Sequence, residues 1–144
     1  MIDMLPGIDC TTSALTAERI RLDVISQNIA NANTTRNLDG KPYQRQQVTF
    51  ETALRRQETG GGGGALTHTV KVAHVENDQR PPVLVYNPAH PDADHAGMVA
   101  MPAINLSEEM ADLIVASRVF EANLAVVKNS RSMTIQTLSI GKRS

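Results

Sequence analysis

One short segment holds the only cluster of side chains in the sequence that could bind a metal. It contains His90, Asp92, Asp94 and His95. Imidazole and carboxylate groups are the ligands that Zn²⁺, Mn²⁺ and Ca²⁺ use in proteins, so a metal-dependent enzyme is one interpretation. Pro91 and the close spacing favour an exposed turn instead, and no Glu-x-x-His or Cys-x-x-Cys motif completes a site. We predict a solvated loop without a bound metal and keep the enzyme as the alternative.

No other segment carries a recognisable catalytic motif. There is no Gly-x-Ser-x-Gly nucleophile elbow, and Cys10, the only cysteine, stands beside no histidine that could act as its base. The run Gly60–Gly64 lacks the Gly-Lys-Ser/Thr ending of a phosphate-binding loop and is predicted to be a flexible linker. The sequence therefore predicts a protein that is not an enzyme and has no catalytic residue, cofactor or metal.

Charge and hydropathy exclude two further classes of protein. A net charge of −1 does not supply the broad basic surface that binds nucleic acid. No stretch reaches the roughly 20 apolar residues that span a bilayer, so an integral membrane protein is not expected. The start Met1–Met4 has no basic region followed by a long apolar run, so we expect no cleaved secretory signal.

The elements that would position these residues begin with an N-terminal helix. Ile8, Leu15, Leu22 and Ile29 recur every seven residues, a spacing that places apolar side chains along one face of a helix. The pattern predicts an amphipathic helix from about residue 9 to 32. Such a helix is marginal alone in water, because most helical stability comes from packing.

A longer helix is predicted at the other end of the chain. Neither Gly nor Pro interrupts the stretch from Ser107, the expected N-cap, to about Leu138, and the helix would be about 48 Å long. Two apolar rows run along it. The first is Leu106, Leu113, Phe120 and Val127, and the second is Val119, Val126, Met133 and Ile140. Two rows predict that this helix packs on more than one side.

The middle of the chain is predicted to contain short strands. Val48 and Phe50 alternate with polar neighbours, as do Val70 and Val72, and Val83–Tyr86 is an apolar run between prolines. We therefore predict a mainly α fold, in which paired, coiled-coil-like terminal helices carry a small β-containing insert that projects sideways. Residues 1–36 and 105–144 would form the assembly core, and residues 37–104 the irregular, β-rich insert.

Asparagines near the end of the first helix offer a second kind of contact. A carboxamide supplies two donors and an acceptor, so Asn28 and Asn31 could bond across to a partner helix and fix its register. The side chains expected at the assembly interface are Leu15, Leu22, Ile25, Asn28, Ile29, Asn31, Met110, Leu113, Phe120, Leu124, Val127, Val119, Val126 and Met133.

The segment Ser26–Thr34 resembles the Ser-x-Asn-(Ile/Leu)-Ala-Asn-x-x-Thr signature of flagellar rod and hook proteins. Further segments narrow the resemblance to the proximal rod protein of C type, and they extend nearly from end to end. They are Gly40–Tyr43, Val70–Ala73, Leu84–Pro88, Asp92–Asp94, Gly97–Pro102, Glu109–Met110, Ala116–Arg118, Ala122–Asn123, Ser132–Met133 and Thr137–Gly141. The chain departs from the pattern at Phe120, where relatives usually carry Tyr, and in its five glycines.

The resemblance implies a structural subunit of the bacterial flagellar basal body. Such subunits are exported through the flagellar type III apparatus without a cleaved signal. In the periplasmic space they polymerise through their terminal helices into the rod, the drive shaft that transmits torque for motility. The implied partners are copies of the chain, the partner proximal rod protein, the rod–ring junction protein, the membrane-ring protein and the first distal rod protein. Another axial protein, such as the partner proximal rod subunit, is the nearest alternative.

Overall fold

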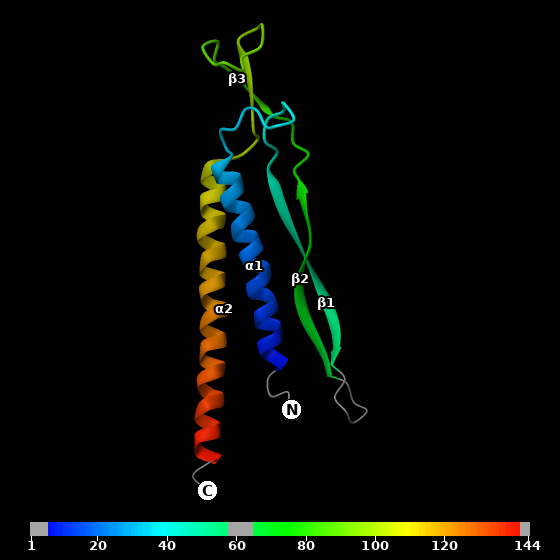
Figure 1. Cartoon of the computed structure of the whole chain (residues 1–144), viewed down its shortest axis with the longest axis vertical. Helices are drawn as coiled ribbons and strands as arrows, with labels where there is room; N and C mark the ends of the chain where they lie inside the picture. Colours follow the sequence, from blue (N-terminus) through cyan, green and yellow to red (C-terminus); the bar gives the residue numbers. More distant parts are fainter. Residues whose placement is uncertain (1–5, 58–64, 142–144) are drawn as a thin grey trace.

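The structure is a computed structural model that describes residues 6–57 and 65–141. Its elements are α1 (Pro6–Ala30), β1 (Gln46–Gln57), β2 (Ala65–Asn77), β3 (Val83–Tyr86), β4 (Met98–Met101) and α2 (Leu106–Gly141). The two helices pack side by side and run in opposite directions, and the strands form two separate hairpins (Figure 1). The predicted fold, paired terminal helices with a small β-containing middle, is confirmed.

Helix α1 starts and ends earlier than predicted. It begins at Pro6, because proline lacks only an N–H that the first turn does not use and its fixed φ suits a helix start. It ends at Ala30, where the N–H of Thr34 bonds the carbonyl of Asn31 in a turn. The predicted limits of 9 and 32 were therefore wrong by two to three residues.

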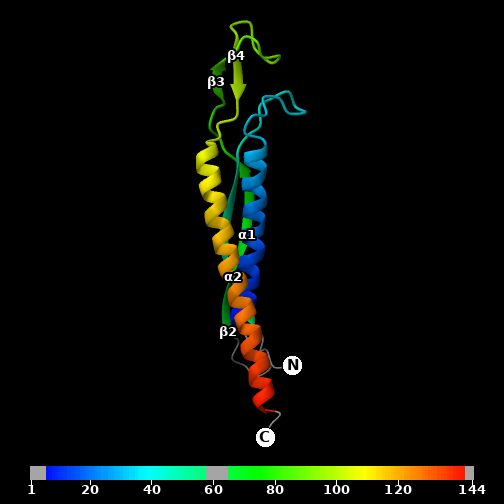
Figure 2. The same cartoon turned by 90° about the vertical axis from the view of Figure 1, so that its left-hand side faces the viewer.

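Helix α2 is capped by a residue outside the predicted helix. The side-chain oxygen of Asn105 accepts the N–H of Ser107 at 3.1 Å, so Asn105 is the N-cap and the assignment of Ser107 was wrong. Glu108 and Glu109 occupy the first turn, where carboxylates are stabilised by the helix dipole. Because α2 is the longer helix, it continues past the start of α1 (Figure 2).

Strand β3 has the predicted bounds, strands β1 and β2 are longer than the sequence predicted, and one strand was missed. Strands β1 and β2 pair from Gln46↔Asn77 to Gln57↔Ala65, with a bulge that leaves Ala73 without a partner. This hairpin packs along α1 and does not project from the helices, contrary to prediction (Figure 1). The linker assigned to residues 60–64 lies outside the described residues. Strand β4, which sequence analysis did not predict, pairs with β3 beyond the ends of the helices (Figure 2).

The core is small and lies mainly between the helices. Ala17 and Ala116 are 3% and 0% exposed, and their short side chains allow the two helices to approach closely. Val24 and Ile25 complete this core, and Val99, in strand β4, is buried separately. Among the described residues, 5 hydrophobic side chains are buried and 17 large ones are exposed. Monomeric proteins rarely expose so much apolar surface, which marks this chain as part of an assembly.

Candidate functional site

The first apolar row of α2 faces α1. Glu109, Leu113, Ala116 and Phe120 follow one another at three- and four-residue steps and so share one helix face. Glu109 and Ala116 are fully buried, and Leu113 and Phe120 are half-buried. Further predicted interface residues on the two helices are also covered within the chain. Of these, Ile25 is buried, and Leu15, Leu22, Ile29, Leu124 and Val127 are half-buried.

The second apolar row of α2 is uncovered in the chain. Val119, Val126 and Met133 are 38%, 50% and 67% exposed. Met110, another predicted interface residue, is 53% exposed. The structure thus separates the predicted interface into a part that α1 already covers and a part that is open to another molecule.

Asn28 lies at the other kind of site, a buried polar cluster where α1, α2 and β1 meet. Its side chain is 1% exposed. The carboxamide nitrogen donates to the carbonyl of Gln46 at 2.9 Å, and the carboxamide oxygen accepts the N–H of the same residue at 2.9 Å. Asn28 therefore pairs with both backbone groups of the first residue of β1, as a neighbouring strand would.

Two more bonds saturate this carboxamide. Its nitrogen donates to Oε2 of Glu109 at 3.1 Å, and its oxygen accepts the hydroxyl of Tyr43 at 3.1 Å. An asparagine side chain has two N–H donors and two acceptor lone pairs, so every one of them is used. The carboxamide is the one group of this length that offers both donors and acceptors. This cluster, Asn28, Tyr43, Arg45, Gln46 and Glu109, is called the polar joint below.

Glu109 is the charged centre of the polar joint. The carboxylate is 1% exposed, and it accepts Nε of Arg45 at 2.5 Å in addition to the bond from Asn28. Burial of a lone carboxylate would cost several kcal/mol, and the arginine removes most of that cost. Burial, together with the nearby negative charge of Glu109, raises the pKa of Tyr43 above its ordinary 10.0 and keeps the hydroxyl protonated.

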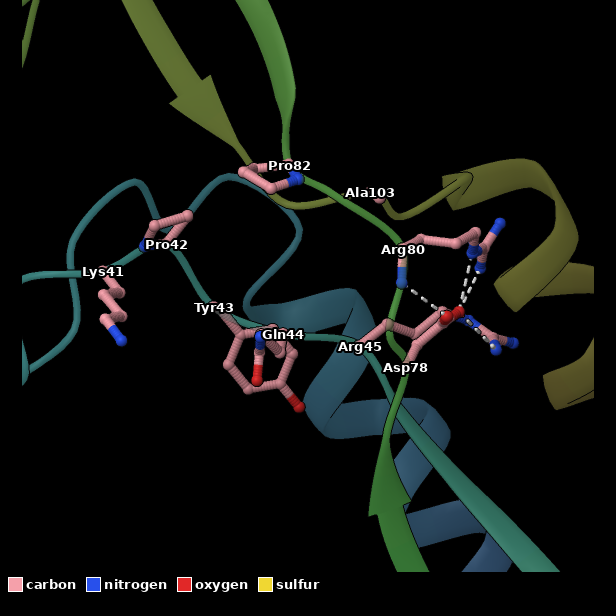
Figure 3. A pocket seen from close by; sticks show the side chains of 9 residues that line it. All are labelled: Lys41, Pro42, Tyr43, Gln44, Arg45, Asp78, Arg80, Pro82 and Ala103. Atoms are coloured by element: carbon pink, nitrogen blue, oxygen red, sulfur yellow. Dashed lines mark hydrogen bonds and ion pairs between the residues drawn. The ribbon is translucent and has the colours of Figure 1, made fainter.

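A second carboxylate holds the other side of Arg45. Asp78 lies 3.9 Å from the guanidinium of Arg45 and 2.7 Å from that of Arg80. The backbone N–H of Arg80, then its side chain and the charge of Arg45, hold the pKa of Asp78 below its ordinary 3.8. Figure 3 shows these three side chains together at one side of a hollow of about 250 Å³, with Lys41 at the other. The hollow is lined by Lys41, Pro42, Tyr43, Gln44, Arg45, Asp78, Arg80, Pro82 and Ala103.

Sequence reasoning found only part of the polar joint. Asn28 was predicted to cross to another helix, and it does bond Glu109 of α2 within the same chain. Asn31 does not cross, because its nitrogen donates to the carbonyl of Gln27 in its own helix at 2.9 Å. Arg45 and Glu109 were missed. The available signal was a charged residue, Glu109, at a position of α2 that otherwise belongs to an apolar stripe.

The segment with metal-ligating side chains is folded on itself. The imidazole Nδ1 of His90 accepts the N–H of Asp92 at 3.1 Å. The carboxylate of Asp94 accepts two backbone N–H groups at 2.8 Å. Thr35 donates to Asp92 at 2.8 Å and ties this loop to the chain that follows α1. Across residues 6–57 and 65–141, no group of three or more such side chains is placed to hold a metal ion.

One glycine shapes the same loop. Gly97 has a φ of +75°, a left-handed conformation that residues with a Cβ rarely adopt. A Cβ at this position would lie 2.9 Å from the Tyr86 ring and 3.2 Å from Pro88. The requirement for glycine here fixes the turn that leads the chain into β4.

These features define a class of protein, a subunit of a larger assembly rather than a catalyst or a carrier. The chain has a saturated polar joint, two long paired helices of which α2 carries an uncovered apolar row, and, within the described residues, no helix long and apolar enough to span a membrane. Comparison with known families specifies the class. The family of flagella basal body rod proteins matches residues 8–36, and that of the C-terminal part of the flagellar basal body rod proteins FlgE, FlgF and FlgG matches residues 95–140.

Whole-length relatives agree with both matches. The flagellar basal-body rod protein FlgC of Borreliella burgdorferi is 41% identical over 95% of this chain and 97% of its own length. The proteins of the same name from Escherichia coli O6:H1 and Bacillus subtilis are 40% and 36% identical, over 96% and 94% of this chain and 98% and 97% of their own lengths. The chain belongs to the FlgC family of flagellar basal-body rod proteins. It is a structural rod subunit that assembles with other rod subunits, and it is not an enzyme, as predicted.

Proposed function

We propose that the chain forms the proximal section of the flagellar rod and polymerises there through its terminal helices. The observation that supports this most directly is the exposure of the second apolar row of α2. Val119, Val126 and Met133 lie on a helix that α1 covers along a different face. Burying such side chains is favourable by about 25 cal/mol per Å², so neighbouring subunits gain free energy by covering them.

The same proposal extends to location and partners. The subunit is exported through the flagellar type III apparatus with its N-terminus intact and assembles in the periplasmic space. Its neighbours there are the partner proximal rod protein, the rod–ring junction protein, the membrane-ring protein and the first distal rod protein. The family membership and the uncovered apolar rows support such lateral contacts.

We also propose two roles within the subunit, and the polar joint supports this proposal. Residues 1–36 and 105–144 form the assembly core, and residues 37–104 form the insert that meets other parts of the basal body. Asn28, Arg45 and Glu109 tie the start of β1 to both helices by buried hydrogen bonds and an ion pair. A shaft that transmits torque needs such a stiff connection between its wall and its outer parts.

A substitution in the exposed row tests the assembly proposal. We expect Val126→Asp to abolish rod formation, because a charge would be desolvated in the subunit contact. The isolated subunit should keep its stability within about 0.5 kcal/mol, because Val126 is 50% exposed. The measurements are electron microscopy of isolated basal bodies, swimming motility, and thermal unfolding of the purified chain.

Gln136→Asp, which adds the same charge at an exposed polar position of α2, is the matched control and should leave rods intact. Normal rods in the Val126→Asp strain would refute polymerisation through this helix. Cryo-electron microscopy of the basal body then tests the position, since density for this chain outside the proximal rod would refute the assignment to that section.

A further inference from the structure

The uncovered surface of α2 includes two rows that lie on different faces of the helix. The basic row continues, beyond the start of α1, the face that α1 covers, since Arg131 and Leu138 lie five full turns after Leu113 and Phe120, and the acidic row lies on another face. With 3.6 residues per turn, residues four and seven apart share a face, and residues about half a turn apart lie on opposite faces. The acidic row consists of Glu108, Asp112, Val115 and Val119. The basic row consists of Lys128, Arg131, Ile135 and Leu138. Apart from Asp112, which is half-buried, all of these residues are exposed.

The charges of the two rows have no ion-pair partner among residues 6–57 and 65–141. Among the described ion pairs, none involves Glu108, Asp112, Lys128 or Arg131. On the side of the basic row, the nearby Glu121 is already paired with Arg118 at 3.1 Å. Four unpaired charges, two of each sign, thus stand on two faces of one helix.

The helix dipole explains only the acidic half of this pattern. Glu108 lies in the first turn of α2, where a carboxylate is favoured. Lys128 and Arg131 stand well before the end of the helix at Gly141, and the last turn of α2 has no basic residue. The helix dipole acts only within the last turn, so it does not explain the positions of Lys128 and Arg131. Their positions favour a partner in another molecule.

The two rows match each other at nearly the same displacement. Glu108 precedes Lys128 by the same number of positions as Val115 precedes Ile135, and Asp112 precedes Arg131 by the same number as Val119 precedes Leu138. The two displacements differ by a single residue. A parallel helix shifted by about 30 Å would therefore bring acid to base and apolar to apolar along the whole contact.

We propose that the acidic row of one copy docks on the basic row of a second copy, with their α2 helices parallel and displaced along the axis. This rests on the proposed polymerisation through the terminal helices and states which faces meet. The contact joins two different faces, so it is heterologous and leaves a free acidic row at one end and a free basic row at the other. Such a contact adds subunits without closing into a dimer. Ile135 and Leu138 are available for it because they are 56% and 58% exposed.

Charge reversal and rescue test the pairing. We expect Glu108→Lys with Asp112→Lys to lower the number of rods per cell by about tenfold or more, and Lys128→Glu with Arg131→Glu to do the same. The chain with all four reversals should recover, because every pair is restored with its sign exchanged. The pair Asp39→Lys and Glu51→Lys, exposed and away from α2, changes net charge by the same amount as the reversal of Glu108 and Asp112 and should have no effect. Failure of the fourfold variant to recover, when its unfolding is unchanged, overturns the proposal.

Cross-linking tests the displacement directly. With Cys10 replaced by serine, the chain has no cysteine of its own. Strains that co-express a Val115→Cys and an Ile135→Cys variant should give a disulfide-linked dimer of the two in isolated basal bodies. Each variant alone should give none, because Cα atoms more than about 7 Å apart cannot be bridged.

A dimer from Val115→Cys alone would show an unshifted or two-fold contact and overturn the proposal. Disulfide links formed only to a different rod protein would show that the partner on this surface is not a second copy of the chain, and they would overturn the proposal. If the chain is in the rods and no cross-link forms, the inference fails while the proposed function stands. If the unsubstituted chain is absent from the rods, the proposed function itself fails.

Discussion

The two ends of α2 differ in how far their side chains are buried within the chain. At its start, Glu109 and its partners are buried and fully hydrogen-bonded within one chain. In its lower half, Val126 and Met133 are 50% and 67% exposed among the described residues. The contacts at the start of α2 are complete when the chain folds, whereas the apolar side chains of its second half can be buried only by other molecules.

The difference follows from what each kind of contact can tolerate. A buried charge costs several kcal/mol when its partner is missing, so a polar cluster belongs where partner and charge are always on the same chain. An apolar row tolerates exposure at a modest cost per side chain, so it can wait in water for a neighbour. The subunit therefore keeps its geometric specificity inside the fold and offers apolar surface outside.

The largest expected effect comes from breaking the polar joint at Asn28. We expect Asn28→Asp to destabilise the isolated subunit by about 4 kcal/mol. The new carboxylate would face that of Glu109 across a contact of 3.1 Å, and it would lose the donor that Gln46 now uses. The measurement is urea unfolding of the purified chain near neutral pH.

Asn33→Asp, an exposed change in the turn after α1, is the matched control and should cost less than about 0.5 kcal/mol. If the two variants unfold alike, the polar joint is not what holds β1 to the helices. A comparison of rods in the Asn28→Asp strain with those in the Val126→Asp strain separates a folding defect from an assembly defect.

The sequence predicted the apolar half of this comparison better than the polar half. Seven-residue spacing identified both rows of α2, because helical periodicity is a local property that one chain segment contains. The polar joint joins residues 28, 45 and 109, and such distant pairings leave no periodic signal. Strand β4 was not predicted for a similar reason. Met98–Met101 becomes a strand only because Gly97 makes the turn before it possible and because it pairs with β3.

A second substitution tests the face of α2 that α1 covers. Leu113 is half-buried on the face of α2 that α1 covers. We expect Leu113→Asp to prevent rod formation and to cost the isolated subunit about 2–3 kcal/mol, because a charge there loses water on the α1 side. Electron microscopy of basal bodies and urea unfolding measure the two effects.

The control for Leu113→Asp is Leu113→Met, which keeps an apolar side chain of similar volume and should cost less than about 1.5 kcal/mol. Rods that form normally with Leu113→Asp would show that the covered face plays no part in assembly. Unchanged unfolding would show that α1 and α2 do not depend on each other in the free subunit, and the contrast with Val126→Asp would disappear.

The smallest expected effect sharpens the comparison through pH. Tyr43 donates to Asn28 at 3.1 Å and has a pKa raised above 10.0 by burial and by Glu109. The folded chain therefore holds this proton more tightly than the unfolded chain. The contribution of this proton to stability is complete below pH 10.0 and is lost as the pH rises through the raised pKa of the folded state.

We expect Tyr43→Phe to cost about 1 kcal/mol at neutral pH and to remove this loss of stability at alkaline pH. The matched control is Tyr86→Phe, because Tyr86 is 69% exposed in the β3–β4 hairpin. Urea unfolding between pH 8 and 11 measures all three proteins, and a Tyr43→Phe curve parallel to that of the unsubstituted chain would mean that the hydroxyl is not part of the polar joint.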